Sequence, residues 1–243
     1  MNLTSNTLHY LNIIRQLICW GAFAVTVPLS ASGQSADVIH QLRRFDITPA
    51  DFLVNLQPVT KNYAFHFTIT EDEDGAVTTM ECSYDPAAAP TWKLNKYCGK
   101  KPGISKNKIL KNRVAAMAKD TVRIDGNSIS IKKLSYYLIV TFSADSTTLP
   151  PLYAYIKDCK GTAYINAATK RLEKITYENF RGTQLGTISV SSLHQDVFVD
   201  IIDGSYRTVK EWREISGKEN SQSKTYTETV DFSVYEKRQT PEK

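Results

Sequence analysis

The sequence predicts a mainly β protein (α+β) built on one strongly curved antiparallel sheet of about ten strands. Apolar and polar residues alternate with the two-residue period of half-buried strands through most of the chain from Asn62 to Tyr235. Turn-forming dipeptides such as Asp203-Gly204 separate the alternating runs. No helical pattern is visible after Lys119, which argues against a doubly wound α/β fold, because that fold needs helices between its strands.

The clearest strand pair lies between Gly161 and Phe180. Apolar Ala163 and Ile165 alternate with polar residues, a turn-like segment covers residues 167–170, and the alternation resumes through Leu172 and Ile175. A run of such strands makes a sheet with one wet face and one apolar face. The apolar face must be covered by helices or occupied by a ligand.

The remaining strands follow from the same alternation. In chain order they are Asn62–Thr70, Ala76–Ser83, Ser128–Ile131, Leu134–Phe142, Leu152–Lys157, Thr187–Val190, Val197–Ile202, Tyr206–Ile215 and a last strand on which Tyr226, Glu228, Val230, Phe232 and Val234 share one face. Helical spacing of apolar residues predicts helices over Ser35–Gln57, with a second helix start at Thr48, and over Ser105–Lys119, whose stripe carries Leu110. We expect these helices to cover the concave side of the sheet.

The first 33 residues have the pattern of a cleaved secretory signal. Arg15 precedes the apolar run Leu17–Val27, and the small residues Ala31-Ser32-Gly33 place the cleavage before Gln34. The alternative is a membrane anchor, but the run is shorter than the ~20 residues of a spanning helix. Cys19 follows Ile18 rather than a small residue, which argues against lipidation. No second apolar segment follows, so we expect residues 34–243 to form one domain, soluble outside the cytoplasm and without a transmembrane span.

The charge of the chain is mild, with 30 basic and 25 acidic residues and a formal net charge of +5. The densest basic run, Lys93–Lys111, is interleaved with Gly, Pro and Asn rather than with stacking aromatic residues. This pattern favours a solvated surface over a nucleic-acid site. Attraction to anionic lipid head groups stays open.

Three cysteines follow the signal, Cys82, Cys98 and Cys159, and an oxidising compartment favours pairing two of them. We predict a disulfide between Cys82 and Cys98, which would close a loop of about 15 residues and contribute roughly 3 kcal/mol. The alternatives are a bridge from either residue to Cys159, or three buried thiols, because connectivity cannot be read from spacing.

The chain contains none of the common catalytic or nucleotide-binding motifs. G-x-S-x-G, HExxH, Walker A and G-x-G-x-x-G are all missing, and the pair Asp196 and Asp200 has a spacing that is common on solvated strands. We therefore predict no enzymatic activity and no cofactor. An unusual site assembled from Tyr164, His194 and Asp196 is the remaining catalytic alternative.

Metal binding is not expected either. Asp72, Asp74, Gly75 and Glu81 fall at positions 3, 5, 6 and 12 of a calcium loop, but position one would be Thr70 and the preceding residues are strand-like. An acidic hairpin turn explains the segment better. His40, His66 and His194 are isolated and lack the spacing of a zinc site.

Several segments resemble the LolA-like superfamily of exported lipoprotein and lipid carriers, in particular an uncharacterised Gram-negative branch. They are Tyr84-Asp85-Pro86, Trp92-Lys93-Leu94, Gly99-Lys100-Lys101-Pro102, the strand and turn from Gly161 to Ile175 with Thr169 and Leu172, and the Asp203-Gly204 hairpin. The resemblance covers most of residues 34–243. It implies a half-barrel fold, a periplasmic location and a role in enclosing acyl chains.

We therefore expect a periplasmic protein that binds a lipid or a lipoprotein acyl chain in the cavity of its curved sheet. Acyl chains are the apolar guests available at a cell envelope. The residues expected to line the cavity are Ile165, Tyr177, Val199, Trp212 and Phe232. The alternative is a filled core with no ligand, in a structural module that presents a sheet edge or the basic segment Lys93–Lys111 to an envelope protein.

Overall fold

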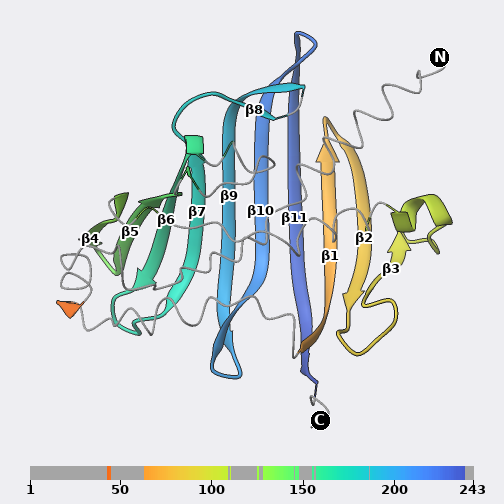
Figure 1. Ribbon diagram of the computed structural model, residues 1–243, viewed down its shortest axis with the longest axis horizontal. Coiled ribbons are helices and arrows are strands. Elements are labelled where there is room, and N and C mark those ends of the chain that lie inside the picture. The colour runs from red at the N-terminus through yellow and green to blue at the C-terminus, as the bar shows by residue number, and fades with distance from the viewer. Residues whose placement is uncertain are drawn as a thin grey trace.

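The described part of the protein is one large open antiparallel sheet (Figure 1). The computed structural model describes residues 43–44, 63–108, 110, 125, 128–144, 146–147, 155, 157–185 and 187–238. Ten strands follow one another across the sheet, an eleventh pairs beside them, and every pairing is antiparallel. The predicted mainly β architecture is confirmed, with one strand more than expected.

The strands are β1 Tyr63–Glu73, β2 Ala76–Tyr84, β3 Trp92–Tyr97, β4 Ser130–Leu134, β5 Tyr137–Ser143, β6 Cys159–Asn166, β7 Leu172–Asn179, β8 Thr183–Leu185, β9 Ile188–Ile202, β10 Ser205–Glu219 and β11 Gln222–Lys237. Their order across the sheet is β3-β2-β1-β11-β10-β9-β7-β6-β5-β4, and β8 pairs with β9. The first strand, β1, therefore pairs with the last, β11, inside the sheet (Figure 1).

Tight turns set the hairpins on either side of this central pair. Asp74 and Gly75 both have positive φ, as do Asp203 and Gly204, which is the backbone of a type I′ turn. The Asp72 carboxylate accepts a hydrogen bond of 2.7 Å from the Gly75 amide. The acidic segment is thus the predicted hairpin turn, and the described residues contain no group of three or more His, Cys, Asp or Glu side chains placed to hold a metal ion.

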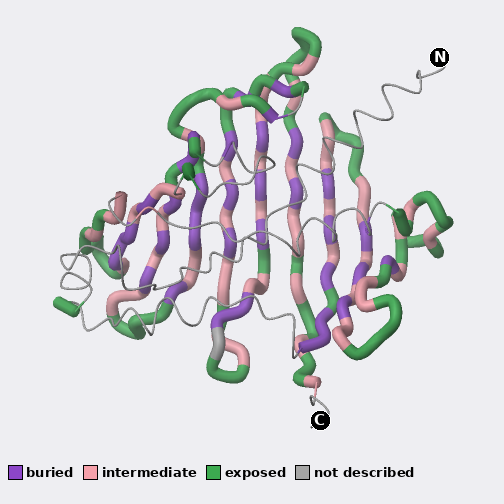
Figure 2. The backbone as a smooth tube through the Cα atoms, viewed as in Figure 1, coloured by how far each residue is buried: buried purple, intermediate pink, exposed green. Residues whose placement is uncertain are grey.

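Burial alternates along the long strands, with buried residues separated by half-exposed ones (Figure 2). The hairpin of β6 and β7 confirms the alternation from Gly161 to Phe180. The segments Thr187–Val190 and Val197–Ile202, expected as two strands, are parts of the single 15-residue strand β9. A bulge at Ser191 shifts the alternation by one residue, because Ser192 pairs with Ser216 and Val190 with Gly217, but no turn separates the two segments.

Two other strand predictions are wrong in detail. The strand expected over Leu152–Lys157 is absent at its described residues, because Tyr155 and Lys157 lie in short 3₁₀ turns and β6 begins at Cys159. Val234 has a φ of 52° and is 58% exposed, so it leaves the face that it was expected to share with Phe232. The left-handed residue adds one position to β11, and Tyr235 takes the inward place beside Phe65.

Helix makes up very little of the described chain. Residues 104–108 and 110 are helical, and the buried Leu110 packs with apolar residues of β1, β2 and β3, as expected for the start of the predicted helix Ser105–Lys119. Most of the predicted helix Ser35–Gln57 and all of the signal segment 1–33 lie outside the described residues. No helix in the described ranges is both long enough and apolar enough to cross a membrane.

The predicted disulfide between Cys82 and Cys98 is not present, and Cys82, Cys98 and Cys159 are all free thiols. The register of β2 and β3 explains why. Cys82 pairs with Leu94, whereas the Cys98 amide donates to the Thr79 carbonyl, three residues away from Cys82. Three strand residues span about 10 Å, which is more than the Cα separation that a disulfide tolerates.

Candidate functional site

Two apolar clusters lie on one face of the sheet, which we call the core face. The β5–β7 cluster contains Leu138, Val140, Phe142, Ala163, Ile165, Leu172, Ile175 and Tyr177, together with Val197 of β9 and Tyr206 of β10. The β1–β3 cluster contains Phe65, Phe67, Ile69, Met80, Cys82, Tyr84 and Leu94, together with Leu110. On this face the β1–β3 cluster lies toward one edge of the sheet and the β5–β7 cluster toward the other, with the long strands β9, β10 and β11 between them.

A band of buried polar residues separates the clusters. Side chains that are paired across neighbouring antiparallel strands point to the same face. The pairings run from Tyr177 to Gln195, from Gln195 to Arg213, from Arg213 to Glu228 and from Glu228 to Glu71. Glu211 lies two residues before Arg213 on the same face of β10. We call Glu71, Gln195, Glu211, Arg213 and Glu228 the buried polar band, and each of them is at most 5% exposed.

The electrostatics of this band are unfavourable for a purely structural core. Arg213 Nη2 lies 3.9 Å from Glu228 Oε1, at the limit of an ion pair. Burial raises the pKa of Glu211 to about 8, while the charge of Arg213 opposes the shift and that of Glu228 adds to it. Glu211 Oε1 has no hydrogen-bond partner. Burying ionisable groups costs several kcal/mol each unless they are well paired, so the band marks a candidate site.

Arg207 extends the polar region toward the end of the sheet where β10 begins. Its guanidinium carbon lies 3.9 Å from the ring centroid of Tyr63, and the side chain is 5% exposed. Arg207 Nε and Nη1 have no hydrogen-bond partner. Burial raises the pKa of Tyr235, Arg207 lowers it and Glu211 raises it, which places both charged groups near that phenol.

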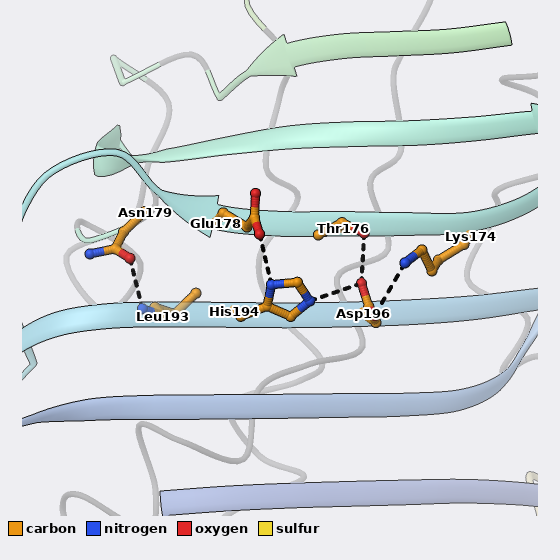
Figure 3. A network of polar contacts seen from close by, with 7 residues as sticks. All are labelled: Lys174, Thr176, Glu178, Asn179, Leu193, His194 and Asp196. Carbon is orange, nitrogen blue, oxygen red and sulfur yellow. Dashed lines mark hydrogen bonds and ion pairs between the residues drawn. The ribbon is translucent and has the colours of Figure 1, made fainter. Parts of the chain in front are cut away.

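The opposite face, the outer face, carries an ordered polar network between β7 and β9 (Figure 3). Asp196 accepts a hydrogen bond of 2.6 Å from the Thr176 hydroxyl and lies 3.2 Å from Lys174 Nζ. His194 lies between two carboxylates, with Nε2 at 3.3 Å from Asp196 and Nδ1 at 2.8 Å from Glu178. Burial opposes ionisation of Asp196, but the Thr176 hydrogen bond and the Lys174 charge outweigh it and lower its pKa.

His194 and Asp196 are in contact, as the catalytic alternative of Tyr164, His194 and Asp196 predicts. Among these three residues, however, no nucleophile lies beside His194. Tyr164 lies under the Lys174 ammonium group, 4.9 Å from its ring centroid, rather than beside His194. Each carboxylate and hydroxyl in the network already bonds to another member. The arrangement is a ladder of ion pairs on a partly exposed sheet face, which contributes little to stability.

A polar cleft of about 650 Å³ lies beside β8, lined by Tyr155, Lys157, Asp158, Arg181, Gly182, Thr183, Gln184 and Ser189. Two of its charged side chains, Arg181 and the buried Asp158, form an ion pair with each other.

No protein-family model matches this chain, and no curated protein matches it either. Among solved structures, the chain is similar to a DUF1329 family protein from Desulfovibrio piger, with 9% identity over 87% of this chain and 94% of that chain and a TM-score of 0.35. It is also similar to MucB in complex with MucA(peri), with 9% identity over 83% of this chain and 99% of that chain and a TM-score of 0.18. These scores are too low to support an argument about fold or function.

Four of the five residues expected to line a ligand cavity lie on the core face. Ile165 and Tyr177 are buried in the β5–β7 cluster, and the half-buried Val199 packs against it. The half-buried Phe232 packs against the β1–β3 cluster, where its ring stacks on Phe67 at 6.0 Å. These four residues therefore share one face of the sheet.

Trp212 lies on the outer face instead, where its ring centroid is 5.4 Å from that of His194. A bulge explains the difference. Val199 pairs with Thr208, but Phe198 pairs with Lys210, so Val209 is an extra residue in β10. One extra residue reverses every later side chain of a strand, and it sends Trp212 to the face opposite Val199.

The sequence prediction missed the buried polar band and Arg207. A signal for part of the band was present, since Glu211 and Arg213 have the same parity as the apolar Ile215, and Glu228 stands between Tyr226 and Val230. Charged residues in phase with the apolar set of a strand point to the core face. Arg207 gave no such signal, because it pairs with Asp200, which alternates with the core-face residues Val199 and Ile201, and only the contact with Tyr63 shows where its guanidinium lies.

Proposed function

We propose that this protein binds and carries an apolar ligand, a lipid or a lipoprotein acyl chain, on the core face of its sheet. The observation that carries the proposal is the pairing of two large apolar clusters with a central band of buried polar groups, in which Glu211 Oε1 has no hydrogen-bond partner. A core that served stability alone would gain by replacing the band with apolar residues, since such replacements are often neutral or stabilising. The buried polar band is expected to be retained if the same face must also bind an amphipathic ligand.

In this proposal the sheet curves into a half-barrel whose concave side is the core face, and the chain works in the periplasm after removal of residues 1–33. The protein acts by binding and has no catalytic activity. Each buried CH₂ group of a guest contributes about 0.8 kcal/mol, so one long acyl chain is sufficient for useful affinity. Turnover of an ester, phosphate or peptide substrate that is lost in His194→Ala would contradict the absence of catalysis.

Organic extracts of the purified protein, analysed by mass spectrometry, test the proposal together with titration of a fluorescent fatty acid. We expect a co-purifying lipid and saturable binding. The absence of both would favour a filled core. The chain offers a matched pair of variants, because Phe232 lies on the core face and Trp212 on the outer face.

Phe232→Ala should weaken binding of the fluorescent fatty acid by roughly tenfold, because it removes apolar contact area from the β1–β3 cluster. Trp212→Ala should leave binding unchanged, although it also removes an aromatic side chain that, like Phe232, is half-buried. Equal effects of the two variants would contradict binding on the core face.

A second candidate function, an interaction module for an envelope protein, is favoured by the exposed segment that follows β3. Ile104 is 93% exposed, and Lys100, Lys101 and Lys108 around it are exposed as well. An apolar side chain among cations fits an acidic partner protein. If no lipid binds and deletion of Lys100–Lys108 abolishes capture of a defined partner, this function replaces the first.

A further inference from the structure

Arg207 is a buried cation, and part of its hydrogen-bonding capacity is not used. Buried arginine side chains are normally paired with carboxylates, and a guanidinium group has five N–H donors to satisfy. Arg207 Nε and Nη1 are enclosed and bond to nothing, and no described carboxylate lies within ion-pair distance of the group. Its one strong contact is with the face of the Tyr63 ring, at 3.9 Å. Such a contact stabilises the charge without satisfying the N–H groups.

The polar groups around Arg207 are occupied elsewhere. The Tyr63 hydroxyl donates to Asp203 Oδ2 at 3.1 Å, which engages the nearest turn carboxylate. The Tyr235 hydroxyl donates to the Thr208 carbonyl at 2.6 Å. Both tyrosines are therefore held in place beside the guanidinium, and neither provides it with an acceptor. A bound oxyanion would supply the hydrogen-bond acceptors that the two tyrosines do not.

Arg207 lies beside the β1–β3 cluster. Its guanidinium covers the Tyr63 ring, and Tyr235, whose hydroxyl donates to the carbonyl of the adjacent Thr208, packs against that cluster. A ligand whose hydrocarbon chain covers the β1–β3 cluster would bring one of its ends to this position. Because the Arg207 guanidinium is positively charged, it would favour a ligand whose end is negatively charged.

We propose that Arg207 binds the oxyanion head group, a carboxylate or a phosphate, of a long-chain amphiphile whose hydrocarbon chain lies on the core face. This inference rests on the proposed function and specifies its ligand. Charge-assisted hydrogen bonds from arginine to carboxylate or phosphate are among the strongest that proteins form, and burial strengthens them further. An uncharged amphiphile of the same length would leave the guanidinium unsatisfied and bind more weakly.

The test compares dodecanoate with 1-dodecanol, which share a chain and differ in the head group, by isothermal titration calorimetry of the full-length protein below their aggregation limits. Dodecanoate should bind roughly tenfold to a hundredfold more tightly than 1-dodecanol. In Arg207→Met, which keeps the side-chain volume and removes the charge, the two affinities should become equal. Arg207→Lys should retain part of the preference.

Arg171→Met is the matched control, since it removes the same charge from an exposed turn and should leave the preference intact. Equal binding of both probes to the wild type would overturn the inference while leaving the proposed function standing. A preference that survives in folded Arg207→Met would also overturn it. Binding of neither probe would refute the proposed function itself.

Inorganic phosphate at millimolar concentration distinguishes the source of the oxyanion. If it leaves dodecanoate binding unchanged, the site recognises the head group only together with its chain, as proposed. If inorganic phosphate alone binds to the wild type and not to Arg207→Met, the site serves a free anion and the amphiphile is the wrong ligand. Should Arg207→Met fail to fold, Arg207→Lys takes its place, and a preference for dodecanoate that is undiminished in Arg207→Lys would overturn the inference.

Discussion

Replacing Glu211 by glutamine should change how the stability of the protein depends on pH. Burial holds the Glu211 carboxyl neutral in the folded protein up to a pKa of about 8, against an ordinary value of 4.5. Between these two pH values the unfolded chain releases the proton and the folded chain keeps it. The free energy of unfolding of the wild type therefore falls as pH rises from about 4.5 to about 8, and this contribution is constant above that range.

The magnitude follows from the width of this interval. At about 1.4 kcal/mol per pH unit, the loss attributable to Glu211 has an upper limit of about 5 kcal/mol. Glutamine has nearly the same shape and no charge to lose, so Glu211→Gln removes this dependence. Groups that titrate identically in the two proteins cancel in the comparison. Near pH 5 the two proteins should have similar stability, and at pH 8 the variant should be more stable by at least about 2 kcal/mol.

Urea denaturation followed by tryptophan fluorescence at pH 5, 6, 7 and 8 provides the assay, with the midpoint and slope fitted for each protein. Glu214→Gln is the control, because Glu214 is on the same strand, faces the outer side and is half-exposed. Its stability curve should run parallel to that of the wild type. A stability difference between Glu211→Gln and the wild type that is the same at pH 5 and pH 8 would refute the assignment of Glu211 as a neutral buried acid.

Two further predictions follow from the packing. Gly217→Ala should destabilise the protein by about 1–3 kcal/mol in the same denaturation assay, because a Cβ atom there would lie 2.4 Å from the Ser189 carbonyl oxygen. Gly103→Ala is the control and should have little effect, because a Cβ atom at Gly103 would have no neighbour within 4 Å. In the native protein a thiol reagent should modify the exposed Cys98 rapidly and the buried Cys82 slowly, because burial raises the pKa of the Cys82 thiol to about 12. Rapid modification of both thiols would contradict the burial of Cys82.

The local features of this protein could be predicted from its amino-acid sequence alone. The hairpin of β6 and β7, the tight turns at Gly75 and Gly204, and the inward positions of Ile165 and Tyr177 all follow from patterns that involve neighbouring residues. Alternation with period two and the need for positive φ in a two-residue turn act within a few residues of the chain. Such features can be recognised without knowledge of the fold.

The identity of neighbouring strands, and the side chains that meet across them, became clear only from the folded structure. The pairing of β1 with β11 joins residues as distant as Tyr63 and Lys237, and no local pattern specifies it. The bulge at Val209 reverses the direction of Trp212, and the register of β2 with β3 separates Cys82 from Cys98. Pairing and register minimise the free energy of the whole sheet, because a shift of one residue moves a complete apolar set to the wrong face.

The buried polar band illustrates the same division. Each of its charged residues is ordinary within its own strand, and together they become unusual only when β9, β10, β11 and β1 are aligned side by side. Glu211, Arg213 and Glu228 interact because register places them in adjacent positions on one face. Sequence patterns can locate a charge on the inner side of a strand, but the assembled sheet decides whether that charge has a partner, because a partner on another strand comes within reach only after folding.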